Sequence, residues 1–271
     1  MNKGYLSNVL RRVKLFYLAD WIRFYLKKIL NYPKNSRFKR NYPEVVLPPD
    51  YLMYESFQLD YDKYFNGGYK NAKWIVGYLK KYITLQDLNI LDWGCGPGRV
   101  IRHMPKIINN GCRFYGTDYN EKSINWCKSH LTKIDFNKNS LKAQLPYENN
   151  VMDIIYGISI FTHLSDEMHH DWFKELHRIL KPGGIMFLTT HGDNFKVKLD
   201  KAELKQYNQG QVVVRGEVKE GHRTYCAFQP KTFMHNLFAN VDILEHDELI
   251  SESKNWVPQD VWIIRKPSLL K

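Results

Sequence analysis

The sequence predicts an α/β fold in which a mostly parallel sheet is covered by helices on both faces. Two observations predict this class. Apolar runs of strand length alternate with amphipathic segments of helical period after residue 70. The chain of 271 residues, 44% of them hydrophobic, is also long enough to bury one sizeable core. In such sheets, ligands bind at the carboxyl ends of the strands.

Each element has a local signal. Ser165 can cap a helix that begins with two acidic residues, and the sequence Lys-Pro-Gly-Gly at 181–184 stops that helix. Apolar runs predict strands at 88–93, 112–118, 134–138, 151–160 and 185–191, with further candidates at 211–214, 241–246 and 260–266. Helical spacing predicts helices at 71–83, 100–108, 120–131, 166–180 and 231–238.

The charge of the chain is concentrated at its N-terminus. Residues 1–45 hold 11 Lys or Arg and two acidic residues, whereas the rest of the chain is nearly balanced within a total of +12. We therefore divide the chain into a basic amphipathic helix and linker at 1–45 and a second domain at 46–271. The prolines after residue 31 predict that residues 31–50 are an irregular linker.

The basic helix permits two interpretations. Its apolar residues lie at helical spacing, and Lys and Arg interrupt every apolar run before it reaches the ~20 residues of a membrane span. In one interpretation, residues 1–30 lie on an anionic membrane surface with Trp21 at the interface. In the other, the helix packs on its own domain or on a second subunit.

The cysteines and the search for a signal pattern indicate the cellular compartment. The four cysteines stand apart and show no Cys-x-x-Cys spacing, so the sequence predicts neither a metal site nor a disulfide framework. No segment has the pattern of a secretory signal. We expect a cytoplasmic protein. If residues 1–30 lie on a membrane, we expect peripheral association with the inner face of that membrane.

A glycine-rich turn, "ILDWGCGPGRV" at 90–100, follows the first predicted strand. Dinucleotide-binding turns have the spacing Gly-x-Gly-x-x-Gly, which places a pyrophosphate at a helix N-terminus. Here Gly94, Gly96 and Gly98 give Gly-x-Gly-x-Gly, and Arg99 stands where the third glycine is expected. Asp92 precedes the loop and suits an ammonium group, and Asp118 can accept both hydroxyls of a ribose. The pattern favours a ligand with a ribose and an amino group.

The chain resembles the class I S-adenosylmethionine-dependent methyltransferases. The motifs that carry the resemblance are "LDWGCGPGR" at 91–99, "GTDYN" at 116–120, "LPYENNVMDIIYGISIFTHL" at 145–164 and "LHRILKPGGIMFLTTHG" at 176–192. It implies a Rossmann-like fold with a seven-stranded, mostly parallel sheet and S-adenosylmethionine as the cofactor, to which the basic helix at 1–45 adds an N-terminal helical extension. The cofactor-binding residues that it implies are Asp92, Gly94, Cys95, Gly96, Gly98, Asp118, Tyr119, Asn139, Ser140, Leu141 and Gly157. Asn139 departs from the acid that family members often carry there.

Methyl transfer to a hydroxyl needs a group that removes a proton near neutral pH, and histidine suits that task. His163 follows the fourth predicted strand and His191 follows the fifth, so both are expected at the carboxyl edge of the sheet. They are the candidate general bases, and His163 is preferred. Adjacent His169 and His170 point in different directions on a helix, which argues against a shared metal.

Residues 193–230 form an insertion that we expect to cover the acceptor site, where Tyr207, Arg215, His222 and Tyr225 are candidate acceptor contacts. A further resemblance, to methyltransferases of glycan and cell-envelope biosynthesis, favours O-methylation of a sugar or lipid-linked glycan hydroxyl. The alternatives are an RNA or small-molecule methyltransferase and a non-catalytic scaffold that keeps the fold. Nucleic acid is the less favoured partner, because the basic charge is confined to one aromatic segment.

Overall fold

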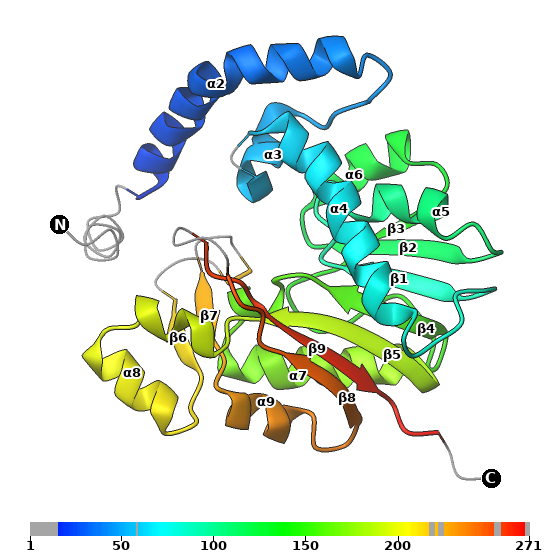
Figure 1. The fold of residues 1–271 in the computed structure, drawn as a ribbon, viewed down its shortest axis with the longest axis vertical. Coiled ribbons are helices and arrows are strands. Elements are labelled where there is room, and N and C mark those ends of the chain that lie inside the picture. The colour runs from blue at the N-terminus through cyan, green and yellow to red at the C-terminus, as the bar shows by residue number, and fades with distance from the viewer. Residues whose placement is uncertain (1–15, 58, 217–219, 222–224, 252–255, 269–271) are drawn as a thin grey trace.

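A computed structural model describes residues 16–57, 59–216, 220–221, 225–251 and 256–268. His222 and the first 15 residues therefore lie outside the described residues. The described part of the chain forms a central sheet with helices on both faces, and a long N-terminal helix lies along the margin of the molecule (Figure 1).

The central sheet has seven strands in the order β3-β2-β1-β4-β5-β9-β8. They are β1 (Asn89–Trp93), β2 (Arg113–Asp118), β3 (Asp135–Lys138), β4 (Met152–Gly157), β5 (Leu180–Thr190), β8 (Asp242–Asp247) and β9 (Asp260–Arg265). Strands β1 to β5 pair in parallel, and β9 is antiparallel to both of its neighbours. The strand order changes direction between β1 and β4, so a crevice for a ligand is expected beyond their carboxyl ends.

Side chains of the strands alternate between two cores. On one face, Ile90 and Ile154 pack with helices α4 (Tyr61–Leu79), α5 (Met104–Ile107) and α6 (Glu121–His130). On the other, Leu91 and Ile155 pack with α7 (Asp166–Ile179) and α9 (Lys231–Leu237). This alternation is the period of two of a β-strand, and it buries both faces as a parallel sheet requires.

The described part of the N-terminal segment contains two helices before α4, namely α2 (Phe16–Asn41) and α3 (Asp50–Phe57). The expectation of an irregular linker from residue 31 is wrong for residues 31–41, because α2 continues through Pro33. Tertiary contacts offset the hydrogen bond that proline cannot donate. The side-chain amides of Asn31 and Asn35 both donate to the carbonyl of Leu59, at 2.9 and 3.0 Å.

Several element boundaries differ from the sequence expectation. Helix α4 begins at Tyr61, ten residues early, where Asp60 accepts a hydrogen bond from the backbone of Lys63. The helix expected at 100–108 is a 3-10 turn (Ile101–His103) followed by four residues of α-helix. Strand β4 ends at Gly157 rather than at residue 160, because Ser159 has a positive φ of 65° that breaks the extended backbone.

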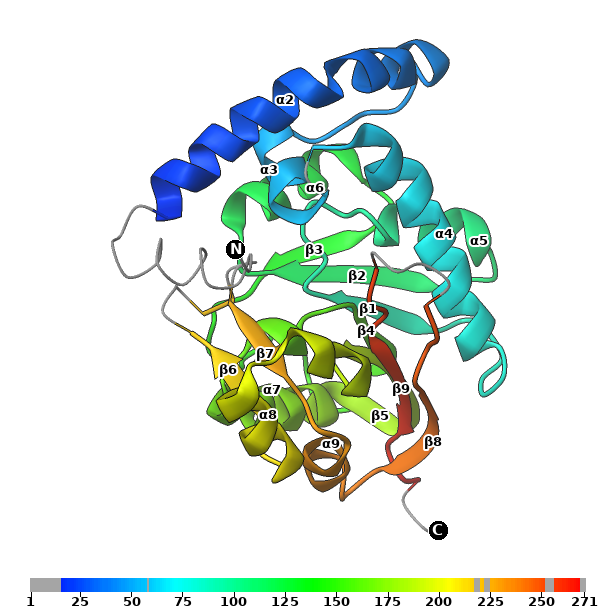
Figure 2. The same cartoon turned by 60° about the vertical axis from the view of Figure 1, so that its left-hand side comes forward.

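The insertion at 193–230 contains the 3-10 helix η3 (Asp193–Lys198), helix α8 (Lys201–Asn208) and strands β6 (Val213–Arg215) and β7 (Cys226–Phe228). The strand expected at 211–214 is thus β6, and it pairs with β7 in a separate two-stranded sheet. The insertion lies on the side of the molecule opposite to β2 and β3, next to α7 (Figure 2). None of the helices in the described ranges is both long and apolar enough to cross a bilayer.

Candidate active site

A cavity of about 850 Å³ opens at the carboxyl edge of the sheet. The loops after β1, β2, β3 and β4 contribute its walls, together with α3, α4, η3 and the segment before β9. Nine of the residues predicted to bind the cofactor line it, namely Asp92, Gly94, Cys95, Gly96, Asp118, Tyr119, Asn139, Ser140 and Leu141. Gly98 and Gly157 do not line it. The structure therefore brings most of the predicted set into one cavity.

The glycine loop that follows β1 has a backbone that only glycine adopts readily. Gly94 has a φ of 76°, and a Cβ atom there would lie 2.1 Å from the side chain of Ile160. The backbone N–H groups of Gly94 and Cys95 both donate to the carbonyl of Thr117 on β2. These contacts hold the loop across the ends of β1 and β2, where it forms part of the cavity wall.

Helix α4 supports the same loop from behind. The hydroxyl of Tyr64 donates to the carbonyl of Pro97 at 2.6 Å, and Arg102 donates to that hydroxyl at 3.2 Å. Burial raises the pKa of Tyr64, so the phenol keeps its proton and acts as a donor. The loop is thus positioned by a buried side chain that lies outside the motif.

Asp92 is a buried carboxyl group at the end of β1. Burial raises its pKa to about 7, although a hydrogen bond of 3.0 Å from the hydroxyl of Tyr156 and the nearby charge of Arg99 oppose that effect. Burial also lowers the pKa of Arg99 to about 10. A cationic group placed in the cavity beside Asp92 would favour its ionised form.

Asp118 stands at the end of β2 with both carboxylate oxygens fixed by backbone donors. One oxygen accepts from the N–H of Gly96 at 2.8 Å and the other from the N–H of Asn120 at 2.7 Å. Each carboxylate oxygen retains a second acceptor site. Asp118 can therefore accept hydrogen bonds from two neighbouring hydroxyl groups while it also anchors the glycine loop.

The wall beyond β3 contains one unsatisfied polar atom. The side-chain amide of Asn139 donates to the carbonyl of Ser140 at 2.7 Å, and its buried Oδ1 has no partner within the described structure. Buried polar atoms are normally paired, so an unpaired acceptor in a cavity wall indicates a place for a donor. Tyr119 lines the cavity next to this wall, and its hydroxyl donates to the carbonyl of Gly221 at 3.2 Å.

His163 lines the same cavity and has a defined tautomer. Its Nδ1 lies 2.6 Å from the carbonyl of Tyr225. Because a carbonyl only accepts, Nδ1 carries the proton and Nε2 is left as the acceptor. Burial lowers the pKa of His163, so the ring is neutral at pH 7. This is the arrangement that a general base requires.

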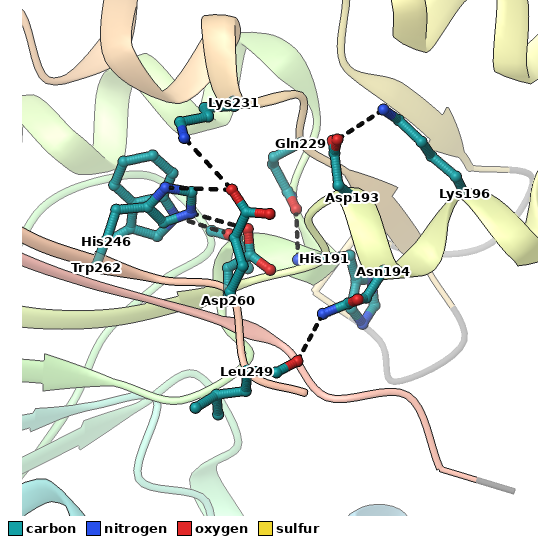
Figure 3. Close-up of polar contacts among 12 residues, drawn as sticks. His191, Asp193, Asn194, Lys196, Gln229, Lys231, His246, Leu249, Asp260 and Trp262 are labelled. Carbon is teal, nitrogen blue, oxygen red and sulfur yellow. Dashed lines mark hydrogen bonds and ion pairs between the residues drawn. The ribbon is translucent and has the colours of Figure 1, made fainter. Parts of the chain in front are cut away.

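His191 does not line the cavity. Its ring stacks on Phe195 with 4.0 Å between ring centroids, and Phe195 separates it from the cavity as a wall residue. Burial lowers its pKa to about 3, and its backbone N–H donates to Gln229 (Figure 3). His191 has no direct access to the cavity, and a catalytic role for it stays a prediction.

Three residues near the end of β4 form a network that the sequence did not reveal. The side-chain amide of Gln259 donates to Ser159 at 2.6 Å, and the hydroxyl of Thr189 donates to Gln259 at 2.6 Å. All three line the cavity. Ser159 has a strained positive φ, which is a recurrent feature of functional sites. Gln259 comes to this place because it precedes β9, which pairs antiparallel with β5. It stands 100 residues along the chain from Ser159.

A second polar cluster lies on the antiparallel strands β8 and β9. His246 contacts Asp260 at 2.9 Å and stacks on Trp262, with 3.6 Å between ring centroids (Figure 3). Neither His246 nor Asp260 lines the cavity. Within the described ranges, no three His, Cys, Asp or Glu side chains are arranged to hold a metal ion.

The insertion contributes to the cavity through residues other than those expected. Phe195 and Gly221 line it, and the N–H of Gly221 donates to the carbonyl of His163 at 3.0 Å. Tyr207 is instead buried with its hydroxyl bonded to Asp193. Arg215 is bonded to Glu203 through two nitrogens, and Tyr225 is buried. These side chains hold the insertion together, which their residue types alone could not show.

Comparison with known proteins agrees with this architecture. Residues 90–184 match a family model described as a methyltransferase domain. A solved SAM-dependent methyltransferase from Methanosarcina mazei is similar over 71% of this chain and 98% of that chain, with 19% identity and a TM-score of 0.55. The chain has the class I methyltransferase fold. The expectation of a Rossmann-like, mostly parallel seven-stranded sheet is confirmed.

Three curated relatives match between 45% and 59% of this chain. A sterol 24-C-methyltransferase of Schizosaccharomyces pombe is 25% identical over 58% of this chain and 42% of its own length. A ubiquinone biosynthesis O-methyltransferase of Coxiella burnetii is 30% identical over 45% of this chain and 51% of its own. A tRNA N(3)-cytidine methyltransferase of Danio rerio is 25% identical over 59% of this chain and 46% of its own. The chain spans about half the length of these relatives, and none of the three names supports the expected link to glycan biosynthesis.

The class I fold implies S-adenosylmethionine as the cofactor, and the residues present fit it. Asp92 offers a buried carboxylate for an ammonium group, and Asp118 offers two oxygens for the ribose hydroxyls. The unpaired Oδ1 of Asn139 suits the amino group of an adenine. A dinucleotide would fit less well, because the loop lacks the third glycine of the dinucleotide-binding pattern.

Proposed function

We propose that this chain is an S-adenosylmethionine-dependent methyltransferase that methylates a hydroxyl group of a small acceptor with an apolar or aromatic body. The observation that carries the proposal is one shared cavity. His163, with Nδ1 protonated and Nε2 as the acceptor, lines the same cavity as Asp92 and Asp118. A proton acceptor and a cofactor site thus meet at the carboxyl edge of the sheet.

S-adenosylmethionine supplies a methyl group made electrophilic by a positively charged sulfur. Asp92 and Asp118 would hold its ammonium and ribose groups, and Asn139 its adenine. Because the methyl group is already activated, the protein contributes mainly by positioning acceptor and donor. The rigid loop at Gly94 and its support by Tyr64 serve that positioning.

His163 removes the proton from the acceptor hydroxyl, which is the part of the reaction that a side chain of the protein performs. Its neutral Nε2 accepts the proton of the acceptor hydroxyl, which leaves the acceptor oxygen more nucleophilic. The bond from Nδ1 to the carbonyl of Tyr225 stabilises the imidazolium that results.

The residues that line the cavity indicate which kind of acceptor fits it. Apolar and aromatic side chains make up much of the cavity lining outside the residues predicted to bind the cofactor, among them Leu52, Trp74, Ile158, Ile160, Leu164, Trp172, Phe195, Leu249 and Val257. Polar residues also line this part, among them Glu55, Asn71, Ser159, Thr189 and Gln259, and the last three bond to one another. An acceptor with an apolar body and one reactive hydroxyl fits this lining better than a free sugar. A sugar hydroxyl would need an apolar carrier, as a lipid-linked glycan provides.

Calorimetry with S-adenosylmethionine and S-adenosylhomocysteine tests the cofactor site directly. We expect micromolar binding of both, since methyltransferases must hold donor and product alike. Binding would justify a screen of phenolic, isoprenoid and lipid-linked glycan acceptors for incorporation of a labelled methyl group. A folded sample that binds neither compound would contradict the proposal and favour the scaffold alternative. Methyl incorporation into RNA alone would place the acceptor in the RNA class.

A further inference from the structure

One face of α2 is apolar and points away from the rest of the molecule. In two views that differ by 60°, α2 lies along the margin of the molecule beyond α3 and α4 (Figures 1 and 2). Eight large side chains on this face are between 46% and 70% exposed. We call them the outer face: Leu18, Trp21, Ile22, Tyr25, Leu26, Ile29, Leu30 and Tyr32.

The outer face is a regular feature of the helix. Leu18, Ile22, Tyr25, Ile29 and Tyr32 follow one another at spacings of three or four residues, which places them along one side of an α-helix. Isolated exposed apolar residues are common on proteins, whereas a contiguous apolar strip marks an interaction surface.

Contacts on the opposite side fix the orientation of this face. Phe24 is buried and packs edge-on against Tyr54 of α3, with 5.3 Å between ring centroids. The carboxylate of Asp20 accepts from the hydroxyl of Tyr54 at 2.7 Å, and Lys34 pairs with Asp60 at 2.6 Å. Helix α2 is therefore held in one rotational setting, and the outer face is directed outward.

The helix carries mainly basic residues around the outer face. Arg23 and Lys27 lie at helical spacing along one edge. Two other lysines are already paired, Lys28 with Asp50 and Lys34 with Asp60. Basic residues also follow toward the end of the helix at positions 37, 39 and 40. Asp20 is the one acidic residue of the helix, and it bonds to Tyr54 on the side away from the outer face.

These observations favour an anionic lipid surface as the occupant. A second copy of the chain would set basic edges against an outer face that carries no acidic residue to receive them. Anionic headgroups neutralise such edges, and they are worth about 1 kcal/mol for each Lys or Arg near the surface. Trp21, Tyr25 and Tyr32 have the apolar ring and polar tip that favour the membrane interface.

We propose that α2 lies on an anionic membrane surface, with its outer face in the interface and its basic edges at the headgroups. This proposal does not depend on the catalytic one. Tyr54 both anchors α2 and lines the cavity, so the docked helix would place the cavity wall at α3 near the membrane. An acceptor carried in the lipid would then have a short path to His163.

Vesicle flotation of the full chain tests the proposal. We expect binding to phosphatidylcholine vesicles that contain about 30 mol% phosphatidylglycerol, and weak binding to phosphatidylcholine alone. The double variant Ile22→Asn with Ile29→Asn should lower the partition coefficient about tenfold or more, because two exposed side chains lose their transfer into the interface. The variant Arg23→Gln with Lys27→Gln should lower it about thirtyfold at low salt.

A matched control separates the outer face from exposed apolar residues in general. Ile250 is 91% exposed and lies outside α2, so Ile250→Asn should change the partition coefficient by less than about twofold. Equal binding of the wild type and the Ile22→Asn, Ile29→Asn variant would overturn the proposal. A second result would also overturn it. If the wild type sedimented as a dimer without lipid and the Ile22→Asn, Ile29→Asn variant as a monomer, a second copy of the chain would occupy the outer face. These readouts need no cofactor and do not depend on the failure or success of the methyl-transfer assay.

Discussion

Replacing His163 tests the proposed chemistry at its most specific point. The variant His163→Gln keeps a side chain that can donate to the carbonyl of Tyr225, which accepts from the histidine at 2.6 Å. It removes the basic Nε2. Positioned general bases contribute about 10²–10⁴-fold, so kcat should fall by that factor, which corresponds to about 3–5 kcal/mol of transition-state free energy.

The pH profile gives a second readout of the same group. Burial lowers the pKa of His163 below its ordinary value of 6.5, and protonation removes the acceptor at Nε2. The wild-type rate should therefore fall as the pH decreases through this lowered pKa, and the acid limb should lie below pH 6.5. In His163→Gln this limb should be absent. Initial rates of labelled methyl transfer between about pH 4.5 and 8 measure both effects.

Controls separate this effect from a general loss of structure. His170→Gln changes an imidazole that is 59% exposed, and it should retain the wild-type rate. His191→Gln should have a smaller effect than His163→Gln, since His191 lies behind Phe195. The affinity for S-adenosylmethionine should be unchanged in His163→Gln. A kcat within about threefold of the wild type, with the acid limb retained, would refute the assignment of His163.

Three further variants test the cofactor site and its support. Asp118→Ala should weaken S-adenosylmethionine binding about 100-fold in calorimetry, because charge-assisted hydrogen bonds are lost. The control variant Asp135→Ala, which changes an exposed carboxylate, should bind with the wild-type affinity. Equal affinities of the two variants would contradict the role of Asp118. Gly94→Ala should lower the free energy of unfolding by about 1–2 kcal/mol, because Gly94 has a φ of 76° and a Cβ there would lie 2.1 Å from the side chain of Ile160. The double variant Gly94→Ala with Ile160→Ala should regain part of this free energy. Urea unfolding measures both. The pKa of Glu175 is lowered: its burial opposes ionisation, but hydrogen bonds from Arg178 and the N–H of Leu145 outweigh that effect. Its ionised form therefore stabilises the fold above the unfolded-state pKa of about 4.5, and this stabilisation is lost as the pH falls through the lowered folded-state pKa. Glu175→Gln should accordingly cost about 1–2 kcal/mol at pH 7 and less near pH 4, and an equal cost at both would refute this account.

Local sequence signals predicted the elements of the sheet well. Strands β1, β2 and β3 lie within one residue of the predicted ranges, and Ser165 caps α7 as expected. These elements combine a strong apolar period with a turn or cap at each end, so neighbouring residues contain the whole signal. Helix α2 was mispredicted beyond residue 30, because the contacts that sustain it through Pro33 come from Leu59 and Asp60.

The cofactor half of the site could be predicted because its residues stand in short motifs after strands. Asp92, the glycine loop and Asp118 meet at one edge since β1 and β2 are parallel neighbours. The rest of the cavity wall could not be predicted in the same way. Gln259 and Tyr54 come from distant parts of the chain, and no motif next to either of them marks a cavity.

The sequence by itself determined the fold class, the cofactor loop and the pair of candidate bases, because each depends on the period or spacing of nearby residues. Only the tertiary structure decided which of the two histidines lies at the cavity, since it placed His163 in the cavity wall and His191 behind Phe195. It also decided which side of α2 is buried, through Phe24 and Asn35, and so left the outer face exposed. Both decisions depend on contacts between segments far apart in the chain, and a pattern of neighbouring residues does not contain that information.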